Sequence, residues 1–132
     1  MCIRDRPEIV ADLGHHNCIV LRQAGSDYAL WRFQKEGQEQ VQKVTGTLSS
    51  NDGEVVVGLA LDGHGLILRS YWDVQAHLDN GRLVALLPDH QAPRADIYAV
   101  YQYRRHVPQR ISAFVGYLQQ ALAARLPALY GL

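Results

Sequence analysis

Short apolar runs alternate along this chain with segments that have the spacing of amphipathic helices. Residues 18–21 and 66–68 are apolar runs with the length of buried strands. Residues 55–60 and 111–126 instead repeat apolar positions at spacings of three and four, which is typical of helices with one buried face. Because strands separated by helices usually pair in parallel, this order predicts an α/β fold with a mixed or mostly parallel sheet.

The remaining elements follow from turn residues and local alternation. Pro7 and Gly14 delimit a short helix over 7–14. Residues 28–33 and 39–44 have the composition of two strands, joined by a glycine-containing turn. The same signals predict a strand over 45–49, a helix over 71–78, and strands over 83–87 and 96–101.

Length and charge limit the class of protein. The chain has 132 residues, enough for one domain, with 13 Lys and Arg against 13 Asp and Glu. A net charge of zero argues against a nucleic-acid-binding module, which needs a surplus of cations. No apolar run approaches the roughly 20 residues that span a bilayer, and no secretory signal follows Met1. We therefore expect a cytoplasmic protein without a membrane partner.

The sequence contains no recognisable catalytic or cofactor motif. No serine lies in a G-x-S-x-G elbow, and no glycine run has dinucleotide-binding spacing. The six histidines form no metal-binding pair on a helix, and the two cysteines, Cys2 and Cys18, are too few for a zinc site. We therefore expect no catalytic residue, no metal and no cofactor. Cys18, within an apolar strand, is expected to be an inert core thiol.

The junction at residues 49–54 is the best candidate for a binding site. Asn51 is a good N-cap residue and Glu54 follows three positions later, a variant of the capping box. The helix N-terminus that follows attracts anions, and ligands of open α/β sheets gather at the carboxyl ends of strands. Ser49, Ser50 and Asn51 therefore either only cap the helix or also contact a ligand, and both interpretations stay open.

Nine short segments, taken in order, resemble one known family. They are NCIV (17–20), WRF (31–33), GTLSSNDGE (46–54), GHGL (63–66), LRSYWDV (68–74), GRLV (81–84), LPD (87–89), IYAVY (97–101) and RHVPQRISAF (105–114). The ordered set is similar to the effector-binding domain of LysR-type transcriptional regulators over about residues 7–122. The resemblance implies a fold like that of type 2 periplasmic binding proteins. There a small molecule, often a carboxylate, lies in a cleft between two α/β subdomains.

The resemblance also divides the chain. It implies an incomplete second subdomain over 7–105 and the final helix of the first subdomain over 106–126. Residues 1–6 have no counterpart in the family, and 127–132 form a tail. The family's winged helix-turn-helix is unmatched, so promoter DNA is expected to be contacted only through a missing N-terminal domain. The implied partners are a small-molecule effector and further copies in a homo-oligomer, a tetramer in the family.

Five residues are carried over by position as candidate ligand contacts. Ser49, Ser50 and Asn51 match the cleft-lining strand end of the second subdomain. Gly65 and Leu66 match the start of the neighbouring strand, on the same expected wall of the cleft. The implied function is ligand sensing in a transcriptional regulator. The alternative is one lobe of a periplasmic-type solute receptor, which shares the fold; a stand-alone enzyme is disfavoured because no nucleophile and base are paired.

Two groups of cations are further candidates. Arg69-Ser70 stands where the family often has Leu-Pro; Arg69 favours an anionic ligand if it points into the cleft, and otherwise is a solvated loop residue. Arg104, Arg105, His106 and Arg110 either contact an anion or lie in a solvated loop before the last helix. That helix lacks its family neighbours here, so we expect its apolar face to repack or to bind another chain.

Overall fold

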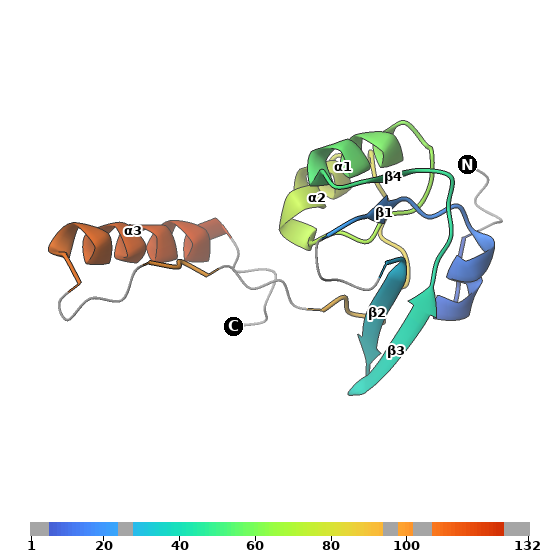
Figure 1. Ribbon diagram of the computed structural model, residues 1–132, viewed down its shortest axis with the longest axis horizontal. Helices are drawn as coiled ribbons and strands as arrows, with labels where there is room; N and C mark the ends of the chain where they lie inside the picture. The colour runs from blue at the N-terminus through green and yellow to red at the C-terminus, as the bar shows by residue number, and fades with distance from the viewer. Residues whose placement is uncertain (1–5, 24–27, 94–97, 102–106, 126–132) are drawn as a thin grey trace. The chain divides into compact units, whose positions relative to one another are not determined.

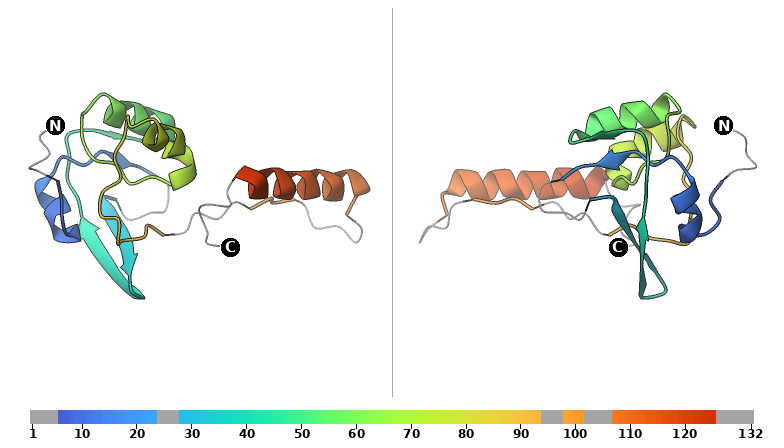
Figure 2. Two further views of the ribbon diagram at one scale, coloured as in Figure 1. Left: turned by 180° about the vertical axis from the view of Figure 1, so that it is seen from behind. Right: turned by 45° about the vertical axis from the view of Figure 1, so that its right-hand side comes forward.

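A computed structural model (Figures 1 and 2) describes residues 6–23, 28–93, 98–101 and 107–125. The chain forms two compact units, Met1–Arg94 and Ala95–Leu132. The subdomain division expected at residue 105 stays a prediction.

A short parallel sheet lies at the centre of the first unit. Strand β1 (Val20–Leu21) pairs in parallel with β4 (Ser49–Ser50), with Val20 opposite Ser49. Two isolated parallel bridges extend this arrangement, one from Asn17 to Thr45 and one from Cys18 to Leu66. The predicted strand over 45–49 is present only as the bridge at Thr45 and the first residue of β4, and the predicted strand over 66–68 only as the bridge at Leu66.

Two helices lie side by side on one side of this sheet, and an antiparallel hairpin extends on the other (Figures 1 and 2). The helices are α1 (Gly53–Leu61) and α2 (Tyr71–Asp79). Each is followed by a glycine with positive φ, Gly63 at +82° and Gly81 at +73°, a conformation that favours glycine after a helix. The sequence leaves Gly63 and Gly65 as alternatives for the end of the first helix and predicts Asn80-Gly81 for the second; the structure has Gly63 and Gly81 in these places.

The buried face of α1 differs from the expected one. Val56 and Val57 are buried, whereas Val55, predicted to be buried, is 49% exposed. In a run of three valines, the spacing of apolar residues does not determine which valines face the core. The residue at which the helix begins determines which of its sides is buried.

The hairpin consists of β2 (Leu30–Lys35) and β3 (Gln38–Lys43), paired in register from Leu30↔Lys43 to Lys35↔Gln38. Its two-residue turn is Glu36-Gly37, with φ of 51° and 78°. Two successive positive φ values match the right-handed twist of the strands. Trp31 and Phe33 are buried on one face of β2, as their alternation predicts.

Three expected elements differ from the structure. The first helix is a 3-10 helix over Val10–His15 rather than a helix from residue 7. The segments 83–87 and 98–101 form no strand in the described part of the chain, and residues 96 and 97 lie outside it.

The last helix, α3 (Gln109–Arg125), begins directly after Pro108, as predicted. No helix within the described ranges combines the length and the hydropathy needed to cross a membrane.

The core of the first unit surrounds β1. Ile19, Val44, Val56 and Cys18 are its largest fully buried side chains. The Cys18 thiol lies 3.6 Å from the Leu13 carbonyl oxygen, to which it donates. Burial raises the pKa of the Cys18 thiol to about 11, which supports the expected inert core thiol.

The raised pKa predicts a loss of stability at alkaline pH. The thiol of the unfolded chain ionises near pH 9.0, its ordinary value, while the folded thiol stays protonated up to its pKa of about 11. The Cys18 contribution is therefore complete below pH 9 and is lost as the pH rises to 11, by about 1.4 kcal/mol for each pH unit. Denaturant unfolding of Cys2→Ser at several pH values measures the slope, and adding Cys18→Ala should reduce it. An equal slope in both proteins would contradict this prediction.

Candidate functional site

The candidate site lies where β4 ends and α1 begins. The Ser50 carbonyl oxygen accepts a hydrogen bond from the Arg22 N–H at 2.7 Å, which ties this end of β4 to the chain beyond β1. The Ser50 hydroxyl oxygen accepts from the Asp52 N–H at 3.1 Å. Ser50 therefore fixes the path of the chain as it leaves the sheet, and its hydroxyl is occupied locally.

The N-cap of α1 is Asp52, not the expected Asn51. One carboxylate oxygen, Oδ1 of Asp52, accepts from the N–H groups of Glu54 at 2.8 Å and Val55 at 3.2 Å. Glu54 is thus the second residue of the helix, too early for the predicted capping box. An ionised carboxylate is a stronger acceptor at the positive end of a helix than an amide oxygen, which favours Asp52 over its neighbour.

This correction leaves Asn51 without a capping role. Within the described ranges, the side chains of Ser49 and Asn51 make no hydrogen bond, and both residues are exposed. The Gly53 N–H, at the first position of α1, likewise has no acceptor in that part of the chain. A hydroxyl, an amide and one backbone donor, within five consecutive residues of the chain, therefore remain without partners among the described residues at this edge of the sheet.

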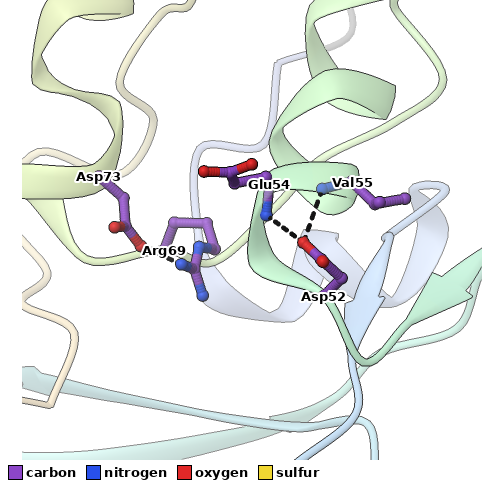
Figure 3. A network of polar contacts seen from close by, with 5 residues as sticks. All are labelled: Asp52, Glu54, Val55, Arg69 and Asp73. Atoms are coloured by element: carbon purple, nitrogen blue, oxygen red, sulfur yellow. Dashed lines mark hydrogen bonds and ion pairs between the residues drawn. The ribbon is translucent and has the colours of Figure 1, made fainter.

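Arg69 packs against the start of α1 (Figure 3). A Cβ atom on Gly53 would lie 2.6 Å from Nη2 and 3.0 Å from Cζ of Arg69, so a larger residue there would require the guanidinium group to move. Nη2 of Arg69 donates to Oδ2 of Asp73, in the first turn of α2, and each side chain is 16% exposed. Arg69 is therefore mostly buried and paired with Asp73, so it is not the solvated loop residue of one alternative; its contact with an anionic ligand stays a prediction. Arg69 connects the first residue of α1 with α2.

The electrostatic surroundings are mixed. Figure 3 shows the carboxylates of Asp52, Glu54 and Asp73 near the single guanidinium of Arg69. Nε of Arg69 is buried and has no hydrogen-bond partner. With more carboxylates than cations in this neighbourhood, the site suits a ligand with few negative charges better than a polyanion.

Gly65 and Leu66 lie at the other end of the parallel segments. Leu66 bonds on both sides of Cys18, donating to the Asn17 carbonyl oxygen at 2.9 Å and accepting from the Ile19 N–H at 2.8 Å. A Cβ on Gly65 would collide with the Asn17 carbonyl oxygen. The structure groups Ser49, Ser50 and Asn51 at the carboxyl end, level with Leu21, and places Gly65 and Leu66 earlier, level with residues 17 and 18. Their role as ligand contacts stays a prediction.

Several residues of this neighbourhood were not singled out from the sequence. Asp52, Gly53 and Asp73 define it as much as the predicted contacts do. Arg69 precedes Ser70, the N-cap of α2, so the helical spacing of side chains gave no signal for its pairing with Asp73. Of the basic cluster, only Arg110 lies in the described residues, where it is exposed.

Comparison with known proteins decides the family. The family model of the LysR substrate binding domain matches residues 3–123. The chain belongs to this family. It therefore has the expected α/β fold of the type 2 periplasmic-binding-protein kind, and the resemblance of the nine segments is confirmed.

Curated relatives are transcriptional regulators. The chain is 38% identical over 122 residues to the HTH-type transcriptional regulator DmlR of Escherichia coli K12, and 35% identical over 121 residues to the HTH-type transcriptional activator TtdR of the same strain. Each alignment covers 92% of this chain and 39% of the relative. The chain thus spans about two fifths of the length of these relatives.

Solved structures agree on the fold. The regulatory domain of AphB from Vibrio vulnificus superposes with a TM-score of 0.69 at 26% identity, over 87% of this chain and 57% of that domain. Full-length AphB of Vibrio cholerae, at 21% identity, matches with a TM-score of 0.70 over 87% of this chain and 39% of that one.

The revised cap predicts unequal effects at adjacent residues. Asp52→Ala removes the acceptor of two N–H groups and should lower the free energy of unfolding by about 1 kcal/mol. Asn51→Ala removes no hydrogen bond seen in the structure and should change it by less than about 0.5 kcal/mol. Urea denaturation of both variants measures the difference. The reverse order would restore Asn51 as the cap.

The Arg69–Asp73 pair predicts strong coupling. Arg69→Met leaves a mostly buried carboxylate without its cation and should destabilise the first unit by about 2–3 kcal/mol. Adding Asp73→Leu removes that uncompensated charge and should recover at least about 1 kcal/mol. Chemical denaturation of the two single variants and the double variant gives the coupling energy. Additive effects would show that the pair is solvated rather than packed.

Proposed function

We propose that this chain is the ligand-sensing part of a LysR-type transcriptional regulator and that it binds a small carboxylate effector at the β4–α1 edge. The observation that carries the proposal is a set of three donors within residues 49–53 that have no partner in the described part of the chain: the Ser49 hydroxyl, the Asn51 amide and the Gly53 N–H. Family membership supports a ligand at the carboxyl end of these strands.

The chemistry of these groups favours an acceptor-rich ligand. The Gly53 N–H carries part of the positive end of the α1 dipole, and hydroxyl and amide groups donate to carboxylate oxygens. Asp52 already neutralises part of that dipole, and Glu54 adds a second negative charge in the first turn. The site is therefore suited to one carboxylate group rather than to a phosphate or a citrate-like polyanion.

The remaining functions of such a regulator are assigned to a longer protein. The curated relatives are more than twice the length that this chain spans. We propose that promoter binding and tetramer assembly use parts of that longer protein, and that the ligand closes a cleft whose second wall lies there. The protein acts in the cytoplasm as a sensor, without a catalytic step.

Ligand binding is tested on this chain by nuclear magnetic resonance. Titration with succinate, and with acetate as the monocarboxylate, should shift the Gly53 backbone amide and the Asn51 side-chain amide before other signals. A saturating ligand at about 100 times its dissociation constant should add roughly 2.7 kcal/mol to the free energy of unfolding. Uncharged succinamide should produce smaller shifts at the same concentrations.

Two variants separate a contact from a structural effect. Asn51→Ala should weaken succinate binding by about tenfold, the equivalent of about 1.4 kcal/mol, while stability stays constant. Asn80→Ala, an exposed asparagine at the end of α2, is the matched control and should leave affinity unchanged. Equal affinities in both variants, or shifts distributed away from 49–53, would overturn the assignment of this edge.

A further inference from the structure

Strand β3 is bonded on one side only. It pairs with β2, and among the described residues no strand pairs with its other side. β2, by contrast, has a second neighbour, because Gln34 exchanges two backbone hydrogen bonds with Gln91 at 2.8 Å each. The 3-10 helix over Val10–His15 joins the core cluster on the hairpin face that carries Trp31 and Phe33. The outer edge of β3 is therefore a place where a further strand can be added.

Three residues of β3 direct their backbone groups to this edge. The Val44 N–H donates to the Ala29 carbonyl oxygen at 2.8 Å, directly beyond the paired strands. Bonded and non-bonded pairs alternate along an antiparallel ladder, so every second residue of β3, counted back from Val44, bonds to β2. The residues between them face outward and are exposed; they are Glu39, Val41 and Lys43. The Lys43 carbonyl oxygen also accepts from the Gln42 side chain at 2.8 Å, which occupies one of its two lone pairs.

The sequence along this edge is complementary to itself. Residues 39–43 have the sequence EQVQK. When two copies pair in antiparallel about a two-fold axis at Val41, Glu39 of each copy lies opposite Lys43 of the other copy, and the two valines lie opposite each other. Opposite charges directly across a sheet stabilise the pairing, whereas an axis at Glu39 or at Lys43 would place like charges opposite each other. The charges therefore select one register.

The side chains of the exposed hairpin face extend this complementarity. Arg32 lies opposite Val41 on this face, and its Nη1 is 3.4 Å from Oε1 of Glu39. In the paired arrangement, each Glu39 carboxylate lies between Arg32 of its own copy and Lys43 of the other copy. Val41 is 47% exposed in the single chain, and its counterpart covers it when two copies pair.

We propose that two copies of this chain pair through the outer edges of β3, in antiparallel register about Val41, and form one four-stranded sheet. The outward N–H and C=O groups of residues 39, 41 and 43 then bond across the axis. A two-fold contact of this kind closes on itself, so it gives a dimer rather than a filament. The contact uses the first unit alone, and it is independent of ligand binding at the β4–α1 edge.

Charge reversal tests the register. Glu39→Lys and Lys43→Glu each place like charges opposite each other at both ends of the paired segment, so each should raise the dimer dissociation constant by about tenfold or more. Light scattering after size-exclusion chromatography, over a range of concentrations, measures this constant and should give a dimer for the unmodified chain. Glu36→Lys makes the same charge change at an exposed position of the hairpin turn, off the outer edge, and should remain dimeric.

Mixing the two charge-reversed variants distinguishes pairing between copies from a loss of folding. In a mixed dimer the two reversed residues lie opposite each other, and so do the two unchanged ones, so both opposite-charge pairs return and a dimer should form. The double variant Glu39→Lys/Lys43→Glu restores both pairs within one sequence and should also be dimeric. A monomeric unmodified chain, a dimer insensitive to both single reversals, or a mixture that stays monomeric would overturn the proposal.

A proline at the centre of the edge tests the backbone pairing with the charges unchanged. Val41→Pro deletes an N–H that faces outward and no hydrogen bond within the hairpin, so it should be monomeric. Val41→Thr retains the N–H and the branched side chain and should stay dimeric. Circular dichroism checks that both variants are folded. A dimer of the folded Val41→Pro variant as tight as that of Val41→Thr would contradict pairing along this edge.

Discussion

The first unit depends on one short stretch of backbone that is bonded on both of its edges. The N–H groups of Cys18, Val20 and Arg22 donate to the segment that leads into β4, and the Ile19 N–H donates to Leu66 on the other side. Successive residues of a strand form hydrogen bonds with the segments on its two opposite sides. The segment 17–22 therefore sets the register of both neighbouring segments. Gly46 has no space for a Cβ beside the Cys18 carbonyl oxygen, which shows how closely the chains approach.

A single amide strengthens this arrangement. The Asn17 side chain donates to the His64 carbonyl oxygen at 2.6 Å and accepts from the Thr47 N–H at 2.9 Å. Thr47 leads to Ser49 and the start of α1, whereas His64 leads to Leu66 and Arg69. The Asn17 side chain therefore links the two segments that lead to the candidate site, and it does so several residues before either segment reaches that site.

The sequence predicted what local chemistry determines. The Glu36-Gly37 hairpin, the buried Trp31 and the helix ends at Gly63 and Gly81 all follow from neighbouring residues, and the structure agrees. The predicted strand over 83–87 failed for a different reason. An apolar run becomes a strand only when another strand pairs with it, and in the described part of the chain its backbone bonds are only those of Leu83 to His77 and of Leu87 to His90.

The candidate site shows the same limit at the level of single residues. The pattern of strand end, polar residues and helix start located the junction, but it did not choose between Asn51 and Asp52 as the cap, since both types cap helices well. The partial burial of Arg69 was outside the reach of local reasoning. It depends on Asp73 in the next helix and on the missing side chain of Gly53, and these meet only after the chain has folded.

The close fit between Gly53 and the Arg69 guanidinium has an evolutionary consequence. A methyl group at position 53 is compatible with this packing only if the residue at position 69 is shorter or turned away. The two positions are therefore not free to vary independently among homologous sequences. Where a relative carries a shorter side chain in place of Arg69, the steric reason for glycine at the start of α1 disappears, and larger residues should become acceptable there.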